Sequence, residues 1–106
     1  MSEKKNKNDT LNPVFELGEI IATKGVADVM NADKDFEKFC LEKLVNHSFG
    51  EWGDLCKRDK KLNDEALTNG TRILSAYEYE SDLSKKIWII TEADRSHTTI
   101  LFPDEY

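Results

Sequence analysis

The fold depends on the stretch Ile87-Trp88-Ile89-Ile90-Thr91-Glu92-Ala93-Asp94-Arg95-Ser96-His97-Thr98-Thr99-Ile100-Leu101-Phe102, the most hydrophobic part of an otherwise polar chain. Two apolar, β-branched runs flank a short polar loop, a pattern typical of a β-hairpin. The core is therefore expected to form on this hairpin. Its loop also brings two acids, an arginine, a serine and a histidine together in the sequence, which makes it the place where chemistry is most plausible.

A period of two precedes this hairpin and predicts one more strand. From Thr71 onward, alternate residues are expected to face opposite sides. Those on one side are Ile73, Ser75, Tyr77 and Tyr79, and those on the other are Leu74, Ala76 and Glu78. A polar turn around Asp82 leads from this strand into the hairpin. The sequence thus predicts a three-stranded antiparallel meander.

Helical periodicity occupies the middle of the chain. Residues 34–47 form the clearest predicted helix, with its apolar face at helical spacing and His47 closing it as a cation suited to the helix dipole. A second helix is predicted for residues 57–68, capped by Asp54 or Asp59. Before both, residues 15–22 read as a strand in which Gly18 marks a bulge or a close approach.

The predicted architecture is α+β. An N-terminal strand, two to three helices and the meander give a sheet of about four strands with helices on one face. Residues 1–13 are polar and predict a flexible tail, and residues 14–106 predict one α+β domain.

Net charge, the length of the apolar runs and the cysteine spacing restrict the functions that the protein can have. The formal net charge of −6 argues against direct nucleic-acid binding, because phosphate contacts need clustered Lys and Arg. No apolar run is long enough for a membrane span and no signal peptide is evident, which predicts a cytoplasmic protein without membrane attachment. Cys40 and Cys56 lack metal-ligand or disulfide spacing and predict reduced thiols. No cofactor or metal is expected.

Several segments resemble a family of small bacterial proteins described as plasmid-related. They are Phe15-Glu16-Leu17-Gly18, Trp52-Gly53-Asp54, Arg72 to Tyr77, Lys86 to Ser96, and Thr98-Thr99-Ile100-Leu101-Phe102-Pro103-Asp104-Glu105-Tyr106. The resemblance covers about residues 14–106. It implies a bacterial protein that is often borne on mobile elements, and it carries over no activity and no catalytic residue. Members of the family have various residues at the position of His97.

The loop between the last two strands offers a catalytic hypothesis. Glu92, Asp94, Arg95 and His97, with Asn63 as a further candidate, could serve a small hydrolase. The simpler interpretation is a turn in which Asp94 and Ser96 bond local amides and Arg95 pairs with a neighbouring acid. Asn63 itself is expected on the buried side of its helix, bonded to backbone.

Aromatic residues offer a binding hypothesis. Trp88, Tyr77 and Tyr79, with Trp52 and Arg95, could form a protein-binding surface if the tryptophan and the tyrosines share a sheet face that no helix covers. Trp52 is also expected to fold back into the core. The register of the strands decides whether Trp88 and the two tyrosines share one face of the sheet or lie on opposite faces.

These observations favour a non-enzymatic protein-binding module whose partner is another protein or a second copy of the chain. The alternatives are the small hydrolase and an acidic inhibitor of a host defence nuclease, which the negative charge and the acidic C-terminus would suit. Whether the protein is an enzyme stays open, with binding preferred.

Overall fold

The structure, a computed structural model, describes residues 12–79 and 82–106. The elements in chain order are β1 (Glu19–Ala22), α2 (Lys24–Ala32), α3 (Lys34–Ser48), α4 (Lys57–Asn69), β2 (Ile73–Tyr79), β3 (Asp82–Thr91), β4 (His97–Leu101) and the 3-10 turn η1 (Pro103–Glu105). This order confirms the predicted α+β class. Apart from Asn12 and Pro13, the tail expected for residues 1–13 lies outside the described residues. None of the helices in the described ranges is long and apolar enough to cross a membrane.

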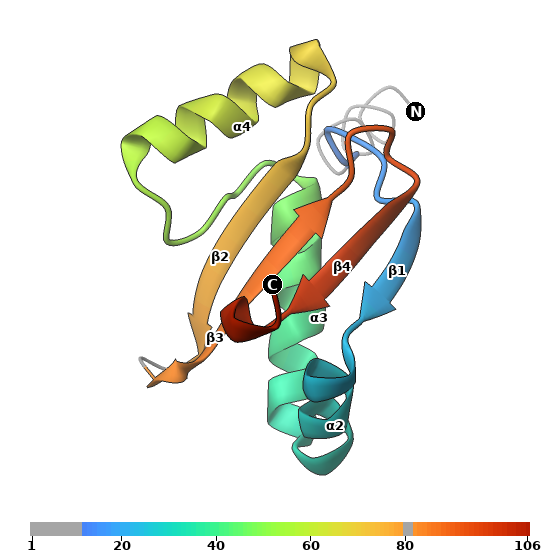
Figure 1. Ribbon diagram of the computed structural model, residues 1–106, viewed down its shortest axis with the longest axis vertical. Helices are drawn as coiled ribbons and strands as arrows, with labels where there is room; N and C mark the ends of the chain where they lie inside the picture. Colours follow the sequence, from blue (N-terminus) through green and yellow to red (C-terminus); the bar gives the residue numbers. More distant parts are fainter. Residues whose placement is uncertain (1–11, 80–81) are drawn as a thin grey trace, which may run out of the picture.

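The four strands form one mixed sheet in the order β1-β4-β3-β2 (Figure 1). The antiparallel meander of β2, β3 and β4 is as predicted. β1 joins it at the outer side of β4 and runs parallel to that strand, with Ile20 opposite Thr98. The first strand and the last are therefore neighbours, and the helices α2, α3 and α4 lie between them in the chain.

Gly18 explains why β1 begins at Glu19, four residues later than expected. Its φ is +66°, in the left-handed region that glycine adopts without strain. A Cβ at this position would lie 2.3 Å from the carbonyl oxygen of Ser96. The close approach proposed from the sequence is confirmed, and the preceding Phe15 turns inward to pack on Trp52 instead of continuing the strand.

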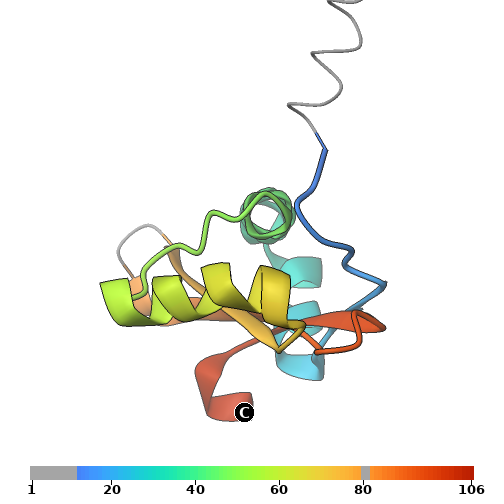
Figure 2. The ribbon, with the colours of Figure 1, turned by 90° about the horizontal axis from the view of Figure 1, so that it is seen from above.

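α3 covers one face of the sheet, as the sequence predicted. Asp33 caps its N-terminus by accepting from the amides of Asp35 and Phe36. Its apolar side is buried against the sheet and includes Phe36 and Cys40. Seen along the sheet, α3 lies on one side and the C-terminal turn η1 on the other (Figure 2).

α4 departs from its prediction at its N-terminus. Its N-cap is Cys56, whose side chain makes no capping bond, so the expected caps are wrong. The buried residues of the helix are Asn63 and Ala66, whereas Leu62 remains 54% exposed. The helix lies beside β2 at the edge of the sheet (Figure 1).

His47 is completely buried between α3 and the sheet and bonds through both ring nitrogens. Nδ1 lies 2.5 Å from Oγ of Ser75 in β2, and Nε2 lies 2.9 Å from Oγ1 of Thr91 in β3. Oγ1 of Thr91 lies 2.7 Å from Oγ1 of Thr98 in β4, which donates to the carbonyl of Leu17 at 2.6 Å. One hydrogen-bond chain thus connects a helix, three strands and the segment before β1.

The donor and the acceptor in each of these hydrogen bonds follow from the final bond, the one between Thr98 and the carbonyl of Leu17. A carbonyl can only accept, so the hydroxyl proton of Thr98 goes to Leu17. Thr98 must then accept from Thr91, and Thr91 must accept from Nε2–H of the imidazole. Nδ1 is left as an acceptor, and Ser75 donates to it. His47 is therefore a neutral ring with its proton on Nε2.

The expectation that His47 ends the helix as a cation is wrong. Burial, reinforced by the nearby charge of Arg95, lowers the pKa of His47 to about 3. Phe15 and Trp52 pack edge-on against the ring, with centroids 5.2 and 5.9 Å away. A charged imidazole at this site would be shielded from solvent, and no carboxylate among the described residues pairs with it.

We predict that the free energy of unfolding falls as the pH is lowered from about 6.5 toward 4.5. The unfolded chain binds a proton at His47 in this window and the folded chain does not, so the loss approaches about 1.4 kcal/mol per pH unit. Urea denaturation at several pH values measures the slope. His47→Gln should flatten it, and a wild-type slope that equals the variant's would contradict the neutral buried ring.

Candidate functional site

The loop between β3 and β4 forms a shallow depression of about 380 Å³ on the surface. Glu92, Asp94, Ser96 and His97 line it together with Ala93. Nδ1 of His97 lies 3.0 Å from Oγ of Ser96, and Nε2 lies 4.0 Å from a carboxylate oxygen of Glu92. A hydroxyl, an imidazole and a carboxylate are thus brought together on an exposed turn.

Asp94 stabilises the turn and does not join the series of Ser96, His97 and Glu92. Its carboxylate accepts from the amide of Ser96 at 3.0 Å. Bonds from the hydroxyl and the amide of Ser96 lower the pKa of Asp94 below its usual value. The amide beside a candidate nucleophile is the usual donor to a developing oxyanion, and here that amide is already bonded. This arrangement matches the local turn predicted from the sequence.

Contrary to the expectation, Arg95 pairs with neither Glu92 nor Asp94, and it forms no ion pair with any other carboxylate that the structure describes. Its φ is +61°, and its side chain leaves the loop surface and runs back toward α4. The guanidinium donates to four carbonyl oxygens, those of Thr71 (2.7 Å), Ala66 (3.1 Å), Glu92 (3.1 Å) and Ala93 (3.3 Å). It also lies 5.7 Å from the centroid of the Phe15 ring. Arg95 therefore ties the hairpin loop to the end of α4.

Asn63 lies apart from the hairpin loop and performs a structural task. Its Nδ2 donates to the carbonyl of Leu74 at 2.7 Å, and its Oδ1 accepts from the amide of Leu74 at 3.3 Å. The Asn63 amide therefore forms with Leu74 the pair of hydrogen bonds that the backbone of a neighbouring strand would form. The predicted bond to backbone is confirmed, and Asn63 is not brought to Glu92 or His97.

The aromatic candidates divide between the two faces of the sheet. Tyr77 and Tyr79 belong to the core with α3, and the hydroxyl of Tyr77 donates to the carbonyl of Glu51. Trp88 pairs with Ala76 in the ladder and so faces the opposite side. The shared face that the binding hypothesis required is therefore absent. Trp52 is buried as expected, with its indole N–H donating to Asp64 at 2.9 Å.

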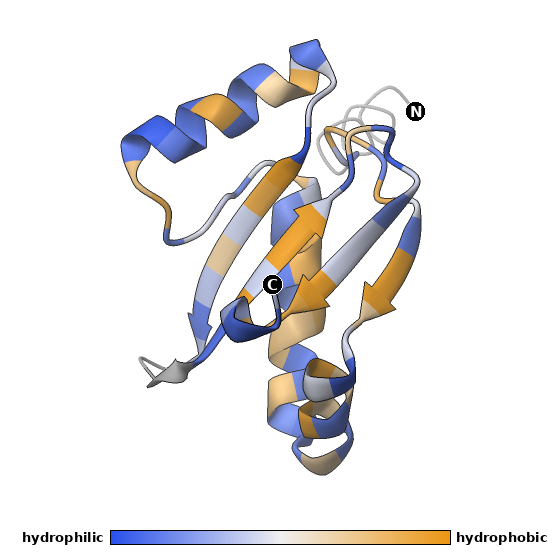
Figure 3. Ribbon diagram, in the orientation of Figure 1, coloured by the Kyte–Doolittle hydropathy of each residue, from blue (hydrophilic) through white to orange (hydrophobic). Residues whose placement is uncertain are grey.

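Trp88 lies on the sheet face opposite α3, which we name the Trp88 face. It comprises Ile21, Leu74, Trp88 and Ile90 on the strands, with Tyr106 from the C-terminal turn and Leu62 from α4 at its borders. Ile90 is buried, Leu74 and Trp88 are half-buried, and Tyr106 is 67% exposed. Hydrophobic residues are concentrated on β1, β3 and the end of β4, and α4 is mostly hydrophilic (Figure 3).

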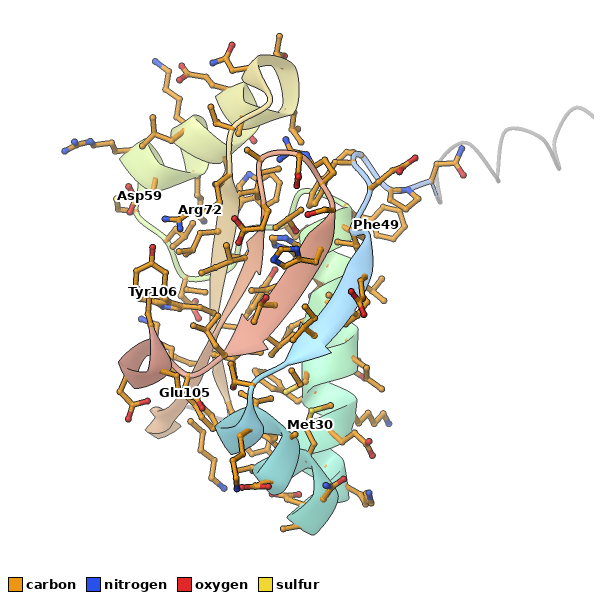
Figure 4. All side chains as sticks on the ribbon, turned by 45° about the vertical axis from the view of Figure 1, so that its right-hand side comes forward. Met30, Phe49, Asp59, Arg72, Glu105 and Tyr106 are labelled. Carbon is orange, nitrogen blue, oxygen red and sulfur yellow. The ribbon has the colours of Figure 1, made fainter. Side chains whose placement is uncertain are left out.

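Arg72 and Tyr106 complete this face, and the sequence reasoning missed both. The Arg72 guanidinium donates to the Tyr106 hydroxyl at 2.7 Å and lies 5.5 Å from the centre of the phenol ring. The phenol in turn packs edge-on against Trp88, with centroids 5.6 Å apart. Figure 4 shows Arg72, Tyr106 and Asp59 on the same side of the molecule. The sequence signal was weak: an aromatic residue shortly after the proline that ends the last strand.

Glu105 fixes the C-terminal turn that carries Tyr106. Its carboxylate accepts from the Thr23 hydroxyl at 2.6 Å, the Phe102 amide at 2.9 Å and the Gly25 amide at 3.1 Å. These bonds lower the pKa of Glu105, and they place an anion at the N-terminus of α2, where the helix dipole favours it. The bonds from Glu105 to Thr23 and Gly25 therefore fix the turn that holds Tyr106 over the Trp88 face.

A groove of about 300 Å³ extends the Trp88 face between β2 and α4. Leu55, Leu62 and Leu74 supply apolar walls, and Asp59 and Arg72 supply opposite charges. Within the described ranges, no group of three or more His, Cys, Asp or Glu side chains could hold a metal ion.

We expect Arg95→Ala to lower the free energy of unfolding by at least about 2 kcal/mol, because four carbonyls lose a charged donor. Arg95→Lys should recover only part of this loss, since an ammonium cannot reproduce the planar fork. Chemical denaturation measures both. His97→Ala, in the same loop, serves as the control and should change stability little; equal losses in Arg95→Ala and His97→Ala would contradict the assigned role.

Comparisons of the chain with protein-family models, with curated proteins and with solved structures give no match. The case for a function therefore depends on the geometry of the loop and of the Trp88 face.

Proposed function

We propose that the protein is a non-enzymatic protein-binding module and that the Trp88 face is its binding surface. One observation carries the proposal: α3 packs on one side of the sheet, and on the other side the aromatic pair Trp88–Tyr106 is left partly in contact with solvent (Figure 2). Apolar patches of this kind, bordered by polar groups, are typical of protein interaction sites.

The residue types on this face support the proposal. Tryptophan, tyrosine and arginine are the residues that most often dominate binding energy at protein interfaces. Here the three are in mutual contact, through the Trp88–Tyr106 ring pair and the Arg72–Tyr106 hydrogen bond. Because the rings and the guanidinium already contact one another, these side chains would lose little conformational entropy when a partner binds.

The partner that we propose first is a second copy of the chain. A two-fold interface brings the same patch on both subunits into contact and so requires a self-complementary surface. Asp59 and Arg72 meet this requirement, since the groove beside the apolar strip carries one charge of each sign. The resemblance to plasmid-related proteins supports a bacterial, mobile-element setting for such a module.

Trp88→Ala should convert a dimer into a folded monomer. Removing the indole takes away the largest apolar contact of the face, and a truncated hot-spot residue typically costs about 2 kcal/mol or more of binding free energy. Sedimentation equilibrium at several protein concentrations measures the dissociation constant, and circular dichroism verifies the fold.

Leu41→Ala is the matched control, because Leu41 is a 50% exposed apolar residue of α3 outside the Trp88 face. It should leave the dimer intact. A wild type that is monomeric at every concentration would eliminate the second copy as partner. If Trp88→Ala also unfolded the protein as readily as Ile89→Ala, which empties the core, Trp88 would be a structural residue and the proposal would fail.

A small hydrolase using the Glu92–His97 loop is the second candidate. The contacts from Ser96 to His97 and from His97 to Glu92 favour it. The bonded amide of Ser96 and the shallow, open depression disfavour it, because ester hydrolysis needs donors for the oxyanion and exclusion of water.

Hydrolysis of p-nitrophenyl acetate distinguishes the two candidates. The binding-module proposal predicts that wild type, Ser96→Ala and His97→Ala release p-nitrophenol at the same non-saturating rate. Saturable turnover that both substitutions abolish would instead establish the loop as a catalytic site.

A further inference from the structure

The outer edge of β2 is closed by atoms of the preceding loop and of α4. The groups that point away from β3 alternate along the strand, and those from the Leu74 amide to the Glu78 amide each have a partner. The bonds run from Leu74 N to Asn63 Oδ1 (3.3 Å), Asn63 Nδ2 to Leu74 O (2.7 Å), Ala76 N to Trp52 O (3.2 Å), Asp54 N to Ala76 O (2.6 Å) and Glu78 N to Asp54 Oδ2 (3.0 Å). No further strand can pair there without displacing them.

No strand among the described residues pairs with the outer edge of β1. The amides of Glu19 and Thr23 donate to carbonyls on the β4 side at 3.0 and 3.1 Å, so odd-numbered residues of the strand face β4. The N–H and C=O groups of Ile20 and Ala22 therefore point away from the sheet. Among residues 12–79 and 82–106, no recorded hydrogen bond reaches these four groups.

Two exposed isoleucines, Ile20 and Ile21, lie in this strand, which is unusual for an unpaired edge. Soluble proteins protect free edges with lysine, proline or a covering element, because an open edge templates pairing with another chain. Ile20 is 44% exposed, and the segment before it contributes the half-exposed Val14. Both line a groove of about 580 Å³ that runs beside the strand, together with Phe15 and Leu17.

The charges at this edge select the kind of partner. Glu16 and Glu19 are exposed beside the apolar groups and give the edge a negative character. A second copy is a poor fit: antiparallel pairing of Ile20 with Ala22 of the partner subunit sets Glu19 against Thr23 of the partner subunit. That threonine bonds Glu105, so carboxylates of the two copies would approach one another.

We infer that the β1 edge binds an extended segment of another protein in which apolar residues alternate with Lys or Arg. The segment adds a fifth strand and forms hydrogen bonds to Ile20 and Ala22. Its apolar side chains pack on Ile20 and Val14, and its basic side chains meet Glu19 on the opposite face. Strand addition of this type takes affinity from main-chain bonds and specificity from alternate side chains.

The test is a titration of the full chain with the synthetic peptide acetyl-Lys-Val-Lys-Val-Lys-Val-Lys-amide, followed by ¹H–¹⁵N NMR. Saturable shifts confined to β1 and the groove are expected, with the amides of Ile20 and Ala22 among the largest. Ile20→Pro removes the outward N–H without touching the ladder to β4 and should weaken binding about tenfold or more, the equivalent of a lost hydrogen bond. Ile20→Val should bind as the wild type does.

A second peptide keeps the experiment decisive even if Ile20→Pro fails to fold. The same sequence with an N-methyl group on every backbone amide retains every side-chain charge but has no backbone N–H to donate from either edge of a strand. It should cause no saturable shifts at β1. Equal binding of both peptides would show simple charge attraction and overturn the inference, as would shifts confined to the Trp88 face. The role of that face is tested separately by Trp88→Ala.

Discussion

The buried imidazole of His47 is the constraint on which the rest of the structure depends. It stands at the end of α3, yet its two nitrogens bond to β2 and β3, and the chain continues through Thr98 to Leu17. Each hydroxyl in the series has one proton to give, so every bond determines the direction of the next. A single geometry satisfies all of them, which fixes how the helix, the meander and the segment before β1 are arranged.

The loop between β3 and β4 also holds this part of the structure together. Gly18 approaches the backbone of the loop so closely that no Cβ fits, and Arg95 reaches from the loop to the end of α4. The loop residues that look chemical in the sequence therefore serve largely to connect elements. Among the residues that the structure describes, the opposite sheet face and the outer side of β1 remain exposed, and these are the surfaces on which we base the proposals of protein binding.

The sequence predicts correctly those features of the fold that local periodicity determines. The α+β class, the meander, α3 and its buried face, and the packing of Trp52 all follow from spacing and side-chain size. It was insufficient where the register between strands decides. Trp88 and Tyr77 belong to different strands, and a one-residue shift of pairing would have put them on the same face.

Long-range polar contacts were equally beyond the reach of the sequence. Arg95 stands beside two acids in the chain, but the carbonyls at the end of α4 offer its fork more acceptors. His47 resembled a helix-terminal cation because its hydroxyl partners come from strands 28 and 44 residues away. The parallel pairing of β1 with β4 likewise joins opposite ends of the chain.

Long-range ¹H–¹⁵N correlation of the histidine side chains tests the central claim most directly. The account predicts that His47 shows the pattern of a neutral ring protonated on Nε2, with a slowly exchanging Nε2 proton, unchanged from neutral pH down to about 5. A ring protonated on Nδ1, or one that titrates near the ordinary histidine pKa, would contradict the directed hydrogen-bond chain and with it the arrangement built on His47.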